Sequence, residues 1–219
     1  MLIACEAVDR CGSVCAWDGR VIAWERCPGP AEAQLVPLLD GYVRRYRPLT
    51  AFAVAAGPGS FTGLRVSVLA VRTLGWLEAV PIYAVDSLVA CAIAQGQGTW
   101  VVLLPLKRDT TFHAVVRVHG SGIEVLSPTS ASHDQDQPQW PPVSEAVVIG
   151  PALASKPSLV ERWLPGVPRG SPAGPDARAV ARLAALSAPR PWDAVLPIYH
   201  QEPAPVLQRA RRLHQNGVA

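Results

Sequence analysis

The sequence predicts an α/β fold in which mixed β-sheets are flanked by helices. The first 26 residues have the pattern of three short strands joined by tight turns, and the residues after them alternate between helical and strand patterns. Hydrophobic residues make up 49% of the 219 residues and charged residues 17%. This composition supplies a large core and excludes a chain that is disordered throughout.

The first strands are marked by apolar runs at residues 2–7 and 13–17. Asp18-Gly19 follows the second run, and this dipeptide is favoured in tight hairpin turns, so residues 21–24 form the returning strand. No basic residue precedes the first run, which therefore reads as a strand rather than as a signal peptide. Apolar runs stop short of the roughly 18 residues that a membrane span needs, so we expect no membrane association.

A helix is predicted near residues 35–46, because apolar residues such as Leu35 and Leu39 recur there at helical spacing. Pro37 is expected in or near its first turn, where proline is tolerated. Similar patterns predict a strand at 51–56, a helix at 60–77, a strand at 81–85 and a short helix at 88–94 capped by Asp86 or Ser87. Three hairpin strands followed by alternating units are the order of an actin-like or ribonuclease-H-like lobe.

The second half begins after Gln95-Gly96-Gln97-Gly98, a stretch typical of a hinge. We therefore expect two lobes, residues 1–98 and 99–219. The second lobe is predicted to contain strands at 100–104, 111–118 and 146–149, a loop at 127–143, a helix at 176–187, an extended segment at 196–200 and a tail helix after it.

The most informative segment is the glycine loop, Gly57-Pro58-Gly59-Ser60-Phe61-Thr62-Gly63-Leu64-Arg65, between a strand and a helix. Glycines permit close approach of a ligand, and the free amides of a first helical turn favour an anion. A phosphate site would draw on Gly57, Gly59, Ser60, Thr62, Gly63 and Arg65. Two alternatives remain: a turn whose glycines only permit close packing, or a phosphate loop that no longer binds. The signatures of a Walker loop and of a hydrolase nucleophile elbow are absent.

The same nine residues resemble the GPGSFTGLR signature of the TsaB (YeaZ) family. Residues 13–19, 80–88 and 196–199 also resemble segments of that family, and the match covers residues 1–118 well and the rest in patches. The resemblance implies a two-lobed actin-like fold of the kind shared by sugar kinases and Hsp70 (the ASKHA fold). It also implies a bacterial, cytoplasmic role in making threonylcarbamoyladenosine next to the tRNA anticodon.

The partners are implied by the resemblance as well. In that family the chain is not the catalyst but pairs with and activates its paralogue TsaD, the threonylcarbamoyltransferase, and the small ATPase TsaE joins them. The resemblance therefore implies no catalytic residue and no cofactor in this chain, a homodimer when the chain is alone, and contact with tRNA through the complex only.

The first hairpin departs from the family pattern. Relatives usually have Asp-Thr-Ser-Thr where this chain has Glu6-Ala7-Val8-Asp9, so Glu6 keeps a carboxylate but the hydroxyl groups are lost. We add Glu6 to the candidate nucleotide site, which we expect to be vestigial. The main alternative is an actin-like ATPase or phosphotransferase that uses the loop Gly57–Gly63. A third interpretation is a peptidase, for which the sequence assembles no nucleophile, base and orienting acid.

The helix at 60–77 carries only two charges, Arg65 and Arg72, and is apolar nearly all round. Such a helix is buried on more than its sheet-facing side, either by the helix at 35–46 or by a partner. We expect a partner surface on these two helices, formed by Leu35, Leu39, Leu64, Val68, Val71, Arg72 and Gly75.

Charge and metal-ligand patterns argue against two further classes. The formal net charge of +3 is too small to indicate autonomous binding of nucleic acid. The five cysteines contain no CxxC pair, and no two of the five histidines stand four residues apart. We therefore expect neither a disulfide framework nor a metal site.

Overall fold

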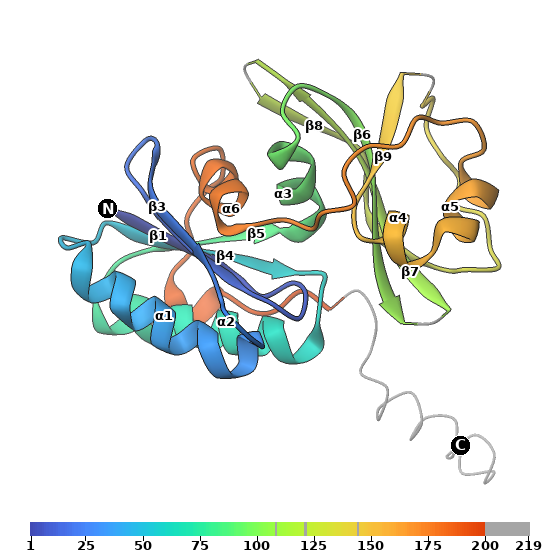
Figure 1. Ribbon diagram of the computed structural model, residues 1–219. Coiled ribbons are helices and arrows are strands. Elements are labelled where there is room, and N and C mark those ends of the chain that lie inside the picture. The colour runs from blue at the N-terminus through green and yellow to red at the C-terminus, as the bar shows by residue number, and fades with distance from the viewer. Residues whose placement is uncertain (108, 121, 144, 200–219) are drawn as a thin grey trace, which may run out of the picture.

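The computed structural model describes residues 1–107, 109–120, 122–143 and 145–199, and it contains two β-sheets with helices packed around them (Figure 1). The first sheet has the strand order β3-β2-β1-β4-β5 and the second the order β8-β7-β6-β9. Both sheets are mixed, because β1 pairs antiparallel with β2 and parallel with β4, and β6 does the same with β7 and β9. The predicted fold class is confirmed.

The first sheet comprises β1 (Leu2–Glu6), β2 (Ser13–Trp17), β3 (Val21–Arg26), β4 (Ala51–Gly57) and β5 (Ile82–Asp86). Helices α1 (Ala31–Arg45) and α2 (Phe61–Leu77) cover one of its faces, and α3 (Ser87–Ala94) and α6 (Ala177–Ala184) cover the other (Figure 1). The carboxylate of Asp86 caps α3 by accepting from the amides of Leu88 and Val89, which confirms one of the two expected caps.

The second sheet comprises β6 (Gly98–Lys107), β7 (Thr110–His119), β8 (Gly122–His133) and β9 (Ala146–Ile149). Helices α4 (Ala152–Ser155) and α5 (Pro157–Trp163) lie on its outer face, and α3 lies against β6 and β7 on its inner face (Figure 1). A single turn of 3-10 helix, Trp192–Ala194, precedes the last described residues. The predicted tail helix and His200 lie outside the described residues.

The largest apolar core lies between the two sheets. It joins Ala4 and Cys15 of the first sheet to Val102 and Val116 of the second through side chains of α3 and α6, such as Val180. The chain thus returns from its second half to complete the packing of the first sheet. The proposed division into lobes 1–98 and 99–219 stays a prediction, although the two sheets do part at Gly98.

Two local predictions are wrong. Helix α1 begins at Ala31, so Pro37 lies inside it and not in its first turn. The apolar periodicity starts only at Leu35, so it does not reveal the first turn of the helix. Residues 127–133 are not a loop but the second half of β8, paired with β7. Ser and Thr are common in loops, which is why the composition of this segment predicts one. Its residues are nevertheless in a strand, because their backbone pairs with the more apolar strand β7.

No helix among the described residues is both long enough and apolar enough to span a bilayer.

Candidate functional site

The glycine loop connects β4 to α2 and is held against the first hairpin. The amide of Ser60 donates to the carbonyl of Val8 at 2.8 Å, and the Ser60 hydroxyl caps α2 by accepting from the amide of Gly63 at 3.3 Å. Two of the amide donors that a bound phosphate would use are therefore already engaged within the chain.

The three loop glycines all face backbone atoms of the same chain. A Cβ atom on Gly57 would lie 2.5 Å from the carbonyl oxygen of Ile198, and one on Gly59 would lie 2.9 Å from that of Val8. A Cβ on Gly63 would collide still more closely with the carbonyl oxygen of Ala7. These contacts favour the close-packing interpretation of the glycines over the phosphate loop.

The polar side chains of the loop do not close around a pocket. Thr62 and Arg65 are exposed, and the Arg65 guanidinium lies 4.7 Å from the centre of the Phe61 ring. A crevice of about 200 Å³ does exist where the two sheets meet, lined by Glu6, Asp9, Cys11 and Arg26 and by residues 172–175. Among the described residues, no member of the loop 57–65 lines it. Glu6 thus lines a crevice that the glycine loop does not line, although the loop packs on Ala7 and Val8 directly after it. The grouping of Glu6 with the loop as a nucleotide site stays a prediction.

Glu6 is the last residue of β1, and its hydrogen bonds connect β1 with β2 and, through Ser13, with α6. One carboxylate oxygen accepts from the amide of Val8 at 3.0 Å and the other from the Ser13 hydroxyl at 2.7 Å. The same hydroxyl accepts from the amide of Ala177, at the start of α6. Burial raises the pKa of Glu6 from 4.5 to about 7, although these hydrogen bonds act in the opposite direction. A carboxylate held in this way serves the packing of α6 on the sheet.

Glu6 should make the stability of the chain depend on pH. Its folded pKa of about 7 lies above its ordinary 4.5, so the folded state gains stability from the bound proton below pH 4.5 and loses it as the pH rises through 7. This difference between the folded and the ordinary pKa corresponds to about 3 kcal/mol of unfolding free energy. We expect the unfolding free energy from urea titrations to fall between pH 5 and pH 8, and Glu6→Gln to remove most of this fall. An equal fall in the variant would contradict the assignment.

The predicted partner residues are mostly core residues, and this corrects our choice of helix face. Leu35, Leu39, Leu64, Val68, Val71 and Gly75 are buried in the chain, with Val68 and Val71 fully inaccessible. The four α2 residues lie at helical spacing: Val68 and Val71 belong to the core under the first sheet, Gly75 packs on Ile82 of β5, and Leu64 packs on Gly57 of β4. Whether the two helices bind a partner stays a prediction.

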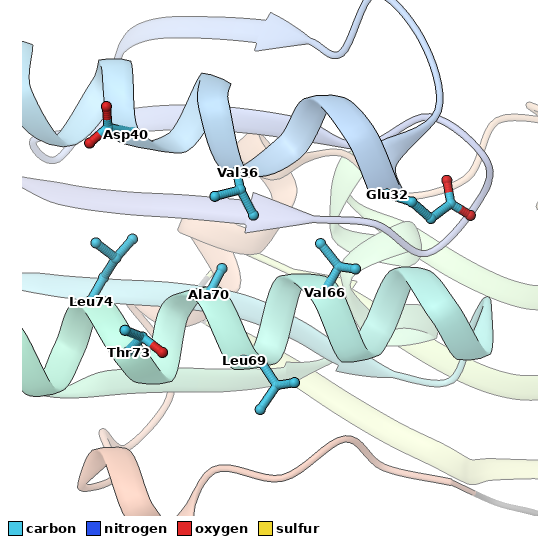
Figure 2. A pocket seen from close by; sticks show the side chains of 8 residues that line it. All are labelled: Glu32, Val36, Asp40, Val66, Leu69, Ala70, Thr73 and Leu74. Carbon is cyan, nitrogen blue, oxygen red and sulfur yellow. The ribbon is translucent and has the colours of Figure 1, made fainter.

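Helices α1 and α2 do expose other apolar side chains. Their exposed fractions are 49% for Val36, 55% for Leu69, 59% for Trp76 and 62% for Leu77. Between the helices runs a groove of about 540 Å³, lined by Glu32, Val36, Asp40, Val66, Leu69, Ala70, Thr73 and Leu74 (Figure 2). In Figure 2, Val66, Ala70 and Leu74 point toward α1, and Val36 points toward α2. We call these exposed residues and the groove the α1–α2 surface.

The C-terminal segment packs along α2 and fixes Arg72. The Arg72 guanidinium donates to the carbonyl of Trp192 at 3.1 Å, and the Trp192 ring lies 6.3 Å from that of Trp76. Farther on, the Tyr199 ring lies 5.3 Å from that of Phe61. Arg72, which we expected at a partner interface, therefore has a role within the chain.

A polar cluster in the second sheet was missed by the sequence analysis. His113 of β7 lies 2.9 Å from the Ser132 hydroxyl of β8 and is nearly inaccessible; burial lowers its pKa to about 4. Within the described ranges the ring nitrogens of His113 bond to the hydroxyls of Ser130 and Ser132, and no carboxylate bonds to them. A serine and a neutral histidine without an orienting acid do not make the triad that a peptidase interpretation requires.

Metal-ligating side chains do not gather elsewhere either. Within residues 1–199, apart from the three undescribed positions, no group of three or more His, Cys, Asp or Glu residues is arranged to hold a metal ion. The five cysteines are free thiols.

Comparison with known proteins places this fold in a class. The chain superimposes on YeaZ from Pseudomonas aeruginosa with a TM-score of 0.75 at 19% identity, over 90% of this chain and 99% of that one. It superimposes with a TM-score of 0.74 on an uncharacterized Pseudomonas aeruginosa protein described as similar to peptidase YEAZ, at 19% identity over 91% and 99% of the two chains. The protein thus has the two-sheet actin-like fold of YeaZ.

The sequence comparison is narrower. A family model described as TsaD, tRNA N6-adenosine threonylcarbamoyltransferase, matches residues 44–109, which contain the glycine loop, α2 and α3. No curated protein sequence matches the chain. Together with the superpositions, this match confirms the resemblance to the TsaB (YeaZ) family that the glycine loop indicates.

Proposed function

We propose that this chain is a TsaB-type subunit of the machinery that makes threonylcarbamoyladenosine in tRNA. In this role it catalyses no step itself but pairs with a TsaD threonylcarbamoyltransferase and activates it, together with TsaE. The YeaZ-like fold and the match of residues 44–109 to the TsaD family model support a TsaB-type role in tRNA modification. The tRNA contacts the chain only through the complex, in keeping with the low net charge of +3.

The exposed apolar α1–α2 surface carries this proposal. Leu69, Trp76 and Leu77 are each more than half exposed on one helix, and the Val36 side chain adds to them from α1. Exposed apolar side chains on two neighbouring helices support an interaction site there, because large exposed apolar patches mark such sites on soluble proteins. When the chain is alone, a second copy covers the same patch through a two-fold symmetric contact.

The packing of the glycine loop and of Glu6 supports the proposal that the chain catalyses no step itself. The glycine loop is packed against the backbone of Ala7, Val8 and Ile198, and the Glu6 carboxylate is engaged by Val8 and Ser13. The same geometry disfavours the alternative of an actin-like ATPase or phosphotransferase, which would need space for phosphates at the loop.

Purified chain should therefore hydrolyse ATP at a negligible rate. The measurement is steady-state phosphate release with Mg²⁺ and ATP, with Glu6→Gln as the matched variant. We expect both proteins to remain at the level of the buffer. Turnover comparable with that of a sugar kinase, abolished by Glu6→Gln, would establish the ATPase alternative instead.

Pairing is tested by co-purification. The chain and the TsaD of its own organism are expressed together with a tag on TsaD only, and the eluate is analysed by size-exclusion chromatography with light scattering. We expect a complex that contains both chains, and a dimer when this chain is purified alone. Elution of the two proteins as separate species would contradict the proposed function.

A further inference from the structure

Two tryptophans stand side by side on the surface at the end of α2. Trp76 belongs to the last turn of this helix and is more than half exposed, and Trp192, in the turn of 3-10 helix Trp192–Ala194, is 41% exposed. The centres of their rings lie 6.3 Å apart. Tryptophan is on average a well-buried residue, so two exposed indole rings in contact indicate a surface that a partner covers.

The chain on both sides of Trp192 holds this residue in place. Before it, the amide of Arg190 donates to the carbonyl of Ile82 at 2.7 Å and the amide of Ile82 donates back at 3.0 Å, which ties the segment to the edge of β5. After it, Val195 is fully buried in the core of the first sheet, and the Arg72 guanidinium donates to the carbonyl of Trp192. A ring that is held in this way loses little conformational freedom when a partner covers it.

The tryptophan pair continues the α1–α2 surface. Leu69 follows the groove residue Val66 by three positions and precedes Trp76 by seven, so the three residues are neighbours around and along α2. In Figure 2, Leu69 points to the side of α2 that is away from α1. The exposed apolar side chains therefore run from Val36 of α1 across α2 to Trp192, in the second half of the chain.

We propose that Trp76 and Trp192 together anchor TsaD, so that the surface for this partner includes the C-terminal segment as well as α1 and α2. The inference rests on the proposed function and deepens it. Tryptophan is enriched among the few residues that dominate the affinity of an interface, and the apolar side chains around such a residue exclude water from it. In the lone chain the two-fold contact with a second copy covers the same rings, and TsaD takes the place of that copy.

The first test is the affinity for TsaD. The TsaD of the same organism is immobilised, and binding is measured by biolayer interferometry at chain concentrations at which light scattering finds a monomer. We expect Trp192→Ala and Trp76→Ala each to weaken binding about thirtyfold. The double variant should weaken it by less than the product of the two effects, because the rings form one contact. Leu186→Ala is the matched control at an exposed apolar residue after α6, and it should leave the affinity unchanged within about twofold.

The second test uses the wild-type chain and so does not depend on the folding of any variant. Hydroxyl radicals oxidise exposed indole rings, and mass spectrometry measures the rate at each tryptophan with and without TsaD. We expect TsaD to slow the oxidation of Trp76 and Trp192 about fivefold or more, and to leave Trp100 of the second sheet unchanged. Circular dichroism verifies that the alanine variants of the first test are folded.

The outcomes separate this inference from the function on which it rests. If the wild-type chain binds TsaD, but the two alanine variants bind as tightly and the rings are not protected, the inference is wrong and the proposed function stands. If Trp192→Ala weakens only the homodimer, the ring belongs to the contact between copies, which also overturns the inference. If the wild-type chain does not bind TsaD, both the inference and the proposed function are wrong.

Discussion

Leu69→Glu is expected to abolish pairing with TsaD while the single chain stays folded. Leu69 is 55% exposed on α2, beside the groove and away from the sheet. In the complex an introduced carboxylate would be desolvated without a partner, at a cost of several kcal/mol, which weakens binding by about a hundredfold or more. In the free chain the same carboxylate stays in water, so the unfolding free energy should change by less than about 0.5 kcal/mol.

The measurement is size-exclusion chromatography with light scattering, with circular dichroism to verify folding. Leu186→Glu is the matched control, since Leu186 is exposed to a similar degree but lies after α6. Leu69→Glu should also weaken any homodimer, because a two-fold contact would use the same patch. If the variant is folded and binds TsaD at wild-type strength, α2 is not the interface. Val68→Glu cannot replace this test, because Val68 is fully buried and its substitution would unfold the chain.

Gly63→Ala is expected to destabilise the chain by about 2–4 kcal/mol, because a new Cβ would collide with the backbone carbonyl of Ala7, which cannot rotate away. Gly41→Ala is the control. Gly41 is an exposed residue of α1 with no atom within 4 Å of an added Cβ, so alanine there should stabilise the helix by up to about 1 kcal/mol. Urea titration measures both effects. Wild-type stability for Gly63→Ala would mean that the loop is not packed on the first hairpin.

Much of the fold follows from local pattern. The strands β2 and β9 are predicted at their observed bounds, because apolar runs of strand formers end there at turn residues. Strand β8 is not predicted, since Ser127, Ser130 and Ser132 become a strand only through pairing with β7. The short helices α4 and α5 are missed for a related reason: four and seven residues are too few for a periodic signal, and their stability comes from packing on the second sheet.

The site is predictable only in part. The sequence places the glycine loop correctly between a strand and a helix. It does not predict the residues on which the glycines pack, because Ala7 and Ile198 come from distant parts of the chain. The choice of partner residues on α2 is wrong about the helix face for a different reason. A helix that is apolar nearly all round does not reveal which side faces the sheet, so the continuous stripe of Val68 and Val71 is the core side, and the more scattered Leu69 and Trp76 are exposed.

The central claim, that this chain activates TsaD without catalysing a step, is tested most directly by reconstituting the modification. Unmodified tRNA is incubated with TsaD, TsaE and the threonylcarbamoyl donor, with this chain present, omitted, or replaced by Leu69→Glu, and threonylcarbamoyladenosine is quantified by mass spectrometry of the digested tRNA. We predict formation with the wild-type chain, and background levels when it is omitted or replaced by the variant. Equal formation in all three reactions, or formation by this chain without TsaD, would contradict the account.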